Sequence, residues 1–178
     1  MIDISSEGET LEACAEVLQA VFGYEAFRGP QAGIVTHVSD GGDALVLMPT
    51  GGGKSLCFQL PALCRDGVTV VISPLIALMR DQVRALKAAG VEAGALTSGN
   101  TEEETEEVFT ALDEGRLKLL YLAPERLAAP ATVPMLRRIG FGRLPGDLRF
   151  RWRGREWDLP LASTLLLSFV ASLIAKWI

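Results

Sequence analysis

Apolar and polar positions follow two different periods along the middle of the chain. Short, Val- and Leu-rich apolar runs predict strands, and longer segments with apolar residues every three or four positions predict helices. Strands are expected at residues 44–48, 68–72, 93–96 and 117–122, and helices at residues 54–63, 75–89 and 101–112. This alternation is typical of an α/β fold in which helices cover both faces of a parallel sheet.

Two further helices are expected before this region. Apolar residues at helical spacing predict a helix over residues 9–22, and Ser6 and Glu9 resemble a capping box at its start. A short helix is expected over residues 31–38. After Leu127 the periodic pattern dissolves, so residues 1–128 are interpreted as one domain and residues 129–158 as a Pro- and Arg-rich linker.

Three short segments directly follow the expected strands. They are the glycine loop at residues 48–55, Ser73-Pro74 and Ala123-Pro124. Because the carboxyl ends of parallel strands share one edge of the sheet, we expect these segments to gather where such folds bind ligands.

The glycine loop reads Met-Pro-Thr-Gly-Gly-Gly-Lys-Ser and lies between an expected strand and an expected helix. Glycines leave backbone N–H groups free to wrap a polyphosphate, Lys54 can reach the terminal phosphates, and the Ser55 hydroxyl can ligate Mg²⁺. The strict phosphate-loop pattern has glycine where this chain has Met48. The alternative interpretation is a glycine-rich turn with an incidental lysine. The candidate phosphate-binding residues are Thr50, Gly51, Gly52, Gly53, Lys54 and Ser55.

Over about residues 15–128 the chain resembles RecQ-type DNA helicases. The similarity rests on residues 22–28, Gln31, the glycine loop, residues 73–83 and residues 121–127, which occur in this order. The resemblance implies part of a RecA-like motor lobe, with ATP and Mg²⁺ as cofactors and ATP-dependent 3'-5' DNA unwinding in repair and recombination as the activity.

The resemblance also assigns roles to individual residues. It implies that Gln31 reads the adenine edge through its amide and that Arg28 and Tyr24 frame the base. The family has Pro-Gly before this glutamine, whereas here the order is Gly29-Pro30, so the turn that aims Gln31 differs. A track for single-stranded DNA would include Ser73, Pro74, Arg80, Gln82, Pro124, Glu125 and Arg126.

Charge is distributed unevenly along the chain, and this limits where DNA could bind. The chain carries a net charge of −5, but residues 1–136 hold 9 Lys/Arg against 19 Asp/Glu, whereas residues 137–178 hold 8 against 3. The net negative charge of residues 1–136 does not indicate DNA binding, so any DNA-binding track must be confined to a small part of the surface. Cys14, Cys57 and Cys64 match no zinc or redox spacing and are expected to be buried free thiols, and His37 is expected to be structural.

Residues that the family uses for hydrolysis are absent from this sequence. In the family an Asp-Glu-x-His segment ends the strand that follows the Ala-Pro-Glu-Arg motif, and here the only Asp-Glu pair, Asp113-Glu114, precedes a strand. A second motor lobe is also absent. We therefore expect that this chain alone neither hydrolyses ATP appreciably nor unwinds DNA.

The end of the chain has a different character. Residues 159–175 contain no charge, and residues 159–178 would span about 30 Å as a helix, which predicts a transmembrane segment. Seven arginines precede it, so the N-terminal domain is expected in the cytoplasm, attached to the inner membrane. The alternatives are a buried core helix or a spurious tail. Residues 142–148 with the following apolar span resemble the second half of a family of small bacterial two-span membrane proteins of unknown function.

The sequence leaves three interpretations open. The first is an incomplete motor lobe of a RecQ-like helicase. The second is a membrane-tethered protein that binds nucleotide or DNA without turnover, in which the basic residues 149–155 contact DNA or anionic lipid. The third is a non-functional gene-fusion product whose strands lack neighbours.

Overall fold

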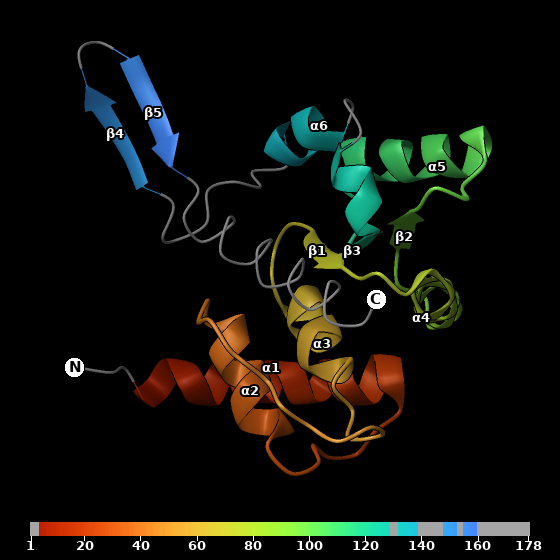
Figure 1. Ribbon diagram of the computed structural model, residues 1–178. Coiled ribbons are helices and arrows are strands. Elements are labelled where there is room, and N and C mark those ends of the chain that lie inside the picture. Colours follow the sequence, from red (N-terminus) through yellow and green to blue (C-terminus); the bar gives the residue numbers. More distant parts are fainter. Residues whose placement is uncertain (1–3, 129–131, 139–147, 153–154, 160–178) are drawn as a thin grey trace. The chain divides into compact units, whose positions relative to one another are not determined.

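The computed structural model describes residues 4–128, 132–138, 148–152 and 155–159 (Figure 1). The chain divides into two compact units, residues 1–127 and residues 128–178. Each unit is described by itself.

Three helices form the first layer of unit 1. They are α1 (Ile4–Phe22), α2 (Gln31–Ser39) and α3 (Leu56–Cys64). Cys14 and Leu18 of α1, Val35 of α2 and Leu60 of α3 are at most 1% exposed and share one apolar cluster. This packing places the start of α3 next to the start of α2, which brings the glycine loop to the segment that precedes Gln31.

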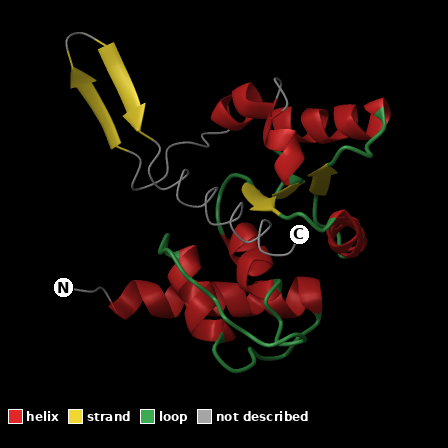
Figure 2. Cartoon of the chain, viewed as in Figure 1, coloured by secondary structure: helices red, strands yellow, loops and turns green. Residues whose placement is uncertain are grey.

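A small parallel sheet forms the second part of unit 1 (Figure 2). Its strands are β1 (Thr69–Ile72), β2 (Ala93–Leu96) and β3 (Leu119–Leu122), in the order β1-β3-β2. The central strand β3 is buried along its whole length, as expected for a strand that is paired on both sides and covered on both faces. Tyr121 lies opposite Val71 on one side and Ala95 on the other.

Helices cover both faces of the sheet, as the sequence pattern predicted. Leu119 and Tyr121 point into a core that includes residues of α3 and of α4 (Ile76–Ala88). On the opposite face lies α5 (Glu102–Asp113), whose Val108 approaches Gly94 so closely that an added Cβ would stand 2.8 Å from Val108 Cγ2.

Two local predictions are wrong. Residues 44–48 form no strand, and Leu45 and Leu47 are 86% and 87% exposed. A strand needs a neighbour for its N–H and C=O groups, and within the described residues no strand pairs with this segment. The helix α1 begins at Ile4, before the predicted start at residue 9, so Ser6 does not mark the start of the helix. The capping box belongs instead to α5, where Thr101 and Glu104 bond reciprocally.

Unit 2 contains elements where the sequence pattern predicted only a linker. The 3₁₀ helix at Pro124–Ala128 leads into it, followed by α6 (Thr132–Arg138) and an antiparallel hairpin of β4 (Leu148–Trp152) and β5 (Arg155–Leu159). The register sets Arg149 opposite Asp158 and Arg151 opposite Glu156. Two of the arginines in the basic segment 149–155 therefore occupy positions paired in register with acidic residues.

The predicted apolar helix at residues 159–178 lies outside the described residues, except that Leu159 ends β5. In the described part of the chain, no helix has both the length and the apolar character needed to cross a membrane.

Candidate nucleotide-binding site

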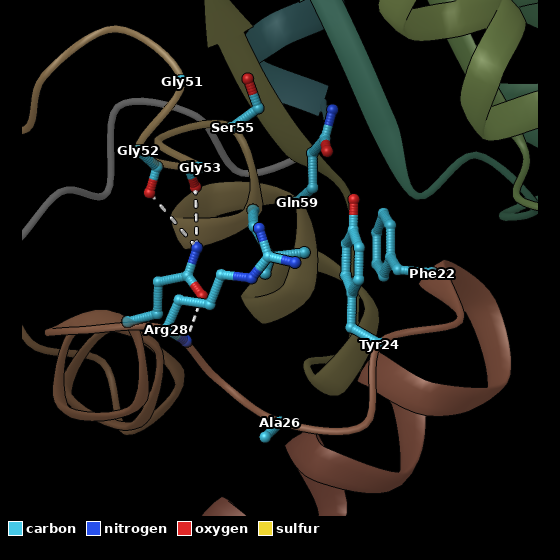
Figure 3. A pocket seen from close by; sticks show the side chains of 11 residues that line it. Phe22, Tyr24, Ala26, Arg28, Gly51, Gly52, Gly53, Ser55 and Gln59 are labelled. Atoms are coloured by element: carbon cyan, nitrogen blue, oxygen red, sulfur yellow. Dashed lines mark hydrogen bonds between the residues drawn. The ribbon is translucent and has the colours of Figure 1, made fainter.

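A cavity of about 220 Å³ opens between the segment that follows α1 and the glycine loop (Figure 3). This volume suits a base, whereas pockets that enclose a whole ligand usually measure about 300–1,000 Å³. The residues that line it are Phe22, Tyr24, Ala26, Arg28, Gln31, Gly51, Gly52, Gly53, Ser55, Leu56 and Gln59. Segments 22–31 and 51–59 thus meet at one cavity.

Gln31, the first residue of α2, ties the two segments together. Gln31 is 4% exposed; Oε1 accepts from the Arg28 N–H at 2.8 Å, and Nε2 approaches the carbonyl oxygens of Gly53 and Gly52 at 3.4 and 3.5 Å. The acceptor end of the amide is therefore held firmly, whereas its donor end makes only long bonds that another acceptor can replace.

Arg28 and Tyr24 form the outer wall of the cavity. The Arg28 guanidinium lies 5.6 Å from the centre of the Tyr24 ring, and Tyr24 is 47% exposed. Gly29 adopts φ +52°, which favours glycine, directly before Pro30 at the start of α2. The Gly-Pro order of this chain thus provides a tight turn that still delivers Gln31 to the cavity.

The glycine loop folds into a turn that depends on two glycines. Gly51 and Gly53 have φ values of +80° and +82°, and the Gly52 N–H donates to the Pro49 carbonyl at 3.1 Å. Lys54 Nζ donates to the carbonyl oxygens of Met48 and Pro49 at 2.8 and 2.9 Å. The lysine is therefore turned onto its own loop, and neither Lys54 nor Thr50 lines the cavity.

Ser55, directly before α3, is held by a residue that the sequence analysis assigned to the DNA track. Gln82 Nε2 of α4 donates to Ser55 Oγ at 3.0 Å, so Gln82 contacts the glycine loop.

Gln59, which sequence reasoning missed, lines the same cavity and donates to the Tyr121 hydroxyl at 3.0 Å. Its position one helical turn after Ser55 was the available signal. Burial raises the pKa of Tyr121, so the hydroxyl stays protonated.

Three loops lie at the carboxyl edge of the sheet. Ser73 and Pro74 follow β1, and Pro124, Glu125 and Arg126 follow β3. Ser73 Oγ accepts from the Leu75 N–H at 3.3 Å, and Arg126 Nε is buried without a hydrogen-bond partner within the described structure.

The third loop, residues 97–100 after β2, was not singled out from the sequence. Asn100 Oδ1 accepts from the Thr97 hydroxyl at 2.6 Å, Asn100 Nδ2 donates to the Ala95 carbonyl at 2.7 Å, and Arg80 Nη2 of α4 donates to the Gly99 carbonyl at 2.9 Å. The same edge rule that selected the other two loops would have found it.

The histidine and cysteines have structural surroundings. His37 Nε2 lies 2.9 Å from the Asp43 carbonyl, and the thiols of Cys14 and Cys64 lie 3.0 Å apart. All three cysteines are free; Cys14 and Cys57 are buried and Cys64 is half-buried. Burial, followed by the neighbouring Cys14, raises the pKa of Cys64 to about 12. Within the described ranges, no His, Cys, Asp and Glu side chains gather into a metal site.

Comparison with known protein families finds matches to two parts of the chain. Residues 28–141, more than half of the chain, match the DEAD/DEAH box helicase family. The chain belongs to the DEAD/DEAH box helicase family. Residues 119–178 match a second family, described as a protein of unknown function (DUF2905).

Curated relatives of this helicase segment are named ATP-dependent DNA helicase RecQ. The chain is 54% identical to the Haemophilus influenzae protein over 111 residues, which are 62% of this chain and 18% of that protein. It is 51% identical to the Pasteurella multocida protein over 65% of this chain and 18% of that protein. It is 43% identical to the Synechocystis protein over 71% of this chain and 27% of that protein. The chain thus spans about a fifth to a quarter of the length of these relatives.

Proposed function

We propose that residues 1–128 form the ATP-binding part of a RecQ-like DNA helicase motor, built as a partial RecA-like lobe. One observation carries the proposal: Tyr24, Arg28 and Gln31 line the same cavity as the glycine loop and Ser55. The base-framing residues and the phosphate loop are separated in the sequence, and the fold places them at one site.

The residues fit Mg-ATP in their chemistry. Within the described structure, the backbone N–H groups of Gly53, Lys54 and Ser55 donate to no carbonyl, so they remain available to an anion at the start of α3. A Cβ at Gly51 would meet no atom within 4 Å, which indicates open space over the loop. In this proposal Arg28 and Tyr24 frame the base and Gln31 reads its edge.

Binding requires one local change in the loop. Lys54 exchanges the Met48 and Pro49 carbonyl oxygens for phosphate oxygens, a charge-assisted interaction that is stronger than its present bonds to neutral carbonyls. Ser55 supplies the protein ligand for Mg²⁺, which when bound neutralises phosphate charge.

The loops at the carboxyl edge of the sheet are proposed to contact single-stranded DNA. Ser73, Pro74 and Pro124–Arg126 lie there, and the buried Nε of Arg126 has no hydrogen-bond partner in the described structure, so the side chain would have to turn outward to donate to a phosphate. Arg80 holds residues 97–100 through its bond to the Gly99 carbonyl, and this bond to a neutral group leaves its positive charge in place. Gln82 contacts Ser55, so a DNA role for it lacks support in this geometry.

The proposal is for binding without appreciable turnover by this chain alone. Asp113 and Glu114 lie at the end of α5, before β3, and not at the end of a strand beside the glycine loop. A carboxylate that places Mg²⁺ and a group that positions water are therefore not provided by the Asp-Glu pair.

Nucleotide binding is tested with the full chain and a fluorescent ATP analogue. We expect saturable, Mg²⁺-dependent binding that Lys54→Met weakens at least about tenfold, because a charge-assisted phosphate contact is lost. Lys87→Met is the matched control, since Lys87 pairs with Glu107 on the exposed side of α4 and α5. Gln31→Ala should reduce the preference for ATP over GTP.

Two results would overturn the proposal. Equal melting temperatures with and without Mg-ATP, together with no analogue binding, would favour a non-functional fragment. DNA-stimulated ATP hydrolysis that disappears in Lys54→Met would instead show that the chain turns over ATP unaided.

A further inference from the structure

Gln82 is the only described side chain of α4 that is hydrogen bonded to the glycine loop. Its amide Nε2 lies 3.0 Å from Ser55 Oγ, although the two residues are 27 positions apart in the sequence. The contact is partly buried, whereas the neighbouring side chains of Asp81 and Arg84 are 70% and 80% exposed. Gln82 is thus turned inward, away from the solvent face of its helix.

A serine hydroxyl that accepts a hydrogen bond from Gln82 can still act as a metal ligand. A hydroxyl has one hydrogen to donate and two lone pairs that accept. Gln82 occupies one lone pair of Ser55, so the second lone pair remains for a cation and the hydrogen for a phosphate oxygen. The amide donor removes the rotational freedom of the hydroxyl without using the groups that a bound metal needs.

The same helix reaches the carboxyl edge of the sheet. Arg80, two residues before Gln82, donates to the Gly99 carbonyl at 2.9 Å and thereby holds the loop that follows β2. A displacement of α4 would therefore act on both the Ser55 hydroxyl and the loop at residues 97–100.

We propose that Gln82 is a positioning residue for Ser55, holding its hydroxyl in the orientation that ligates Mg²⁺, and that α4 links this orientation to the loop at residues 97–100. The inference rests on the proposed ATP-binding function of the glycine loop. It assigns to Gln82 a task in the nucleotide site and not in DNA contact.

The test compares nucleotide affinity with and without Mg²⁺ in the full chain. The dissociation constant of the fluorescent ATP analogue is measured in excess Mg²⁺ and in excess chelator. Gln82→Met keeps the length of the side chain and removes the donor. Gln19→Met makes the same change at an exposed position of α1 and serves as control.

We expect Gln82→Met to reduce the Mg²⁺-dependent gain in affinity by about three- to tenfold, the range of one neutral hydrogen bond, and to leave affinity in chelator within about twofold. Ser55→Ala should lose the same Mg²⁺-dependent gain in affinity. Adding Gln82→Met to Ser55→Ala should cause no further loss of affinity. Gln82→Asn, whose amide is one methylene shorter and cannot reach Ser55, should behave like Gln82→Met and replaces it if that variant fails to fold.

Other outcomes overturn the inference and are distinguishable from one another. Equal weakening in Mg²⁺ and in chelator means that Gln82 only supports the loop structure. An unchanged Mg²⁺-dependent gain means that Ser55 needs no orienting donor. Absence of any analogue binding by the unmodified chain removes the proposed function itself, and the inference with it.

Discussion

Replacing Tyr121 by phenylalanine tests how α3, the helix that follows the glycine loop, is anchored to the sheet. The Tyr121 side chain is 1% exposed and Gln59 is 8% exposed, and the 3.0 Å bond between them joins β3 to α3. The substitution removes only the hydroxyl oxygen, so the ring keeps its packing, including its edge contact with Phe58. What changes is that the Gln59 amide N–H becomes a buried donor without an acceptor.

The expected cost follows from this burial. Leaving a buried donor unpaired costs about 1–3 kcal/mol, more than the roughly 1 kcal/mol net value of an average hydrogen bond. We therefore expect Tyr121→Phe to lower the free energy of unfolding of unit 1 by about 1–3 kcal/mol, measured by urea denaturation followed by circular dichroism.

Two variants make this prediction specific. Tyr24→Phe is the matched control, because Tyr24 is 47% exposed and water replaces any lost contact, so the change should stay within about 0.5 kcal/mol. In Gln59→Leu/Tyr121→Phe both polar partners are gone, and this pair should be less destabilised than Tyr121→Phe alone. A loss below about 0.5 kcal/mol in Tyr121→Phe would refute the reasoning, because it would mean that Gln59 is already satisfied by water.

Three further predictions concern stability. Gly94→Ala should lower the free energy of unfolding by about 1–3 kcal/mol, because its Cβ would stand 2.8 Å from Val108 Cγ2. Gly33→Ala in α2 would meet no atom within 4 Å and should raise the free energy of unfolding by up to about 1 kcal/mol. Urea denaturation of both variants measures this difference. Thr101→Ala should cost about 1 kcal/mol by loss of the α5 capping box, and an unchanged unfolding midpoint would contradict it. Cys64 has a pKa of about 12 in the folded chain against 9.0 for the free group, so above pH 9 the unfolded state releases its proton first, and stability should fall from pH 9 towards pH 12. Cys64→Ala should flatten this part of the pH profile, and an equally steep decline in that variant would exclude the thiol as its cause.

Most of the element order was predictable because its signals are local. The strand at Ala93–Leu96 has the predicted bounds, and the other strands of the sheet differ from the prediction by one or two residues. The glycine loop was recognisable for the same reason, since Gly51 and Gly53 do adopt left-handed conformations. The hairpin of unit 2 was missed although apolar and polar positions alternate over residues 148–152 and 156–159, because the surrounding segment rich in proline and arginine was interpreted as a linker.

The failures have a common physical origin. Residues 44–48 have the composition of a strand, but a strand exists only where another strand accepts its hydrogen bonds, and the sequence pattern does not report that neighbour. The capping prediction at Ser6 failed similarly, because α1 continues to Ile4 past a motif that resembles a start signal.

The sequence by itself indicated the residue types of the candidate site, because the left-handed glycine turns and the start of α3 depend on a few neighbouring residues. Only the tertiary structure decided which side chains meet there. Gln82 contacts Ser55 across 27 positions and Gln59 contacts Tyr121 across 62, and such pairs depend on how helices pack on the sheet. The same packing directs the Gln82 side chain toward the glycine loop and not toward the expected DNA track. The orientation of Gln82 is set by which face of α4 lies against α3 and the sheet.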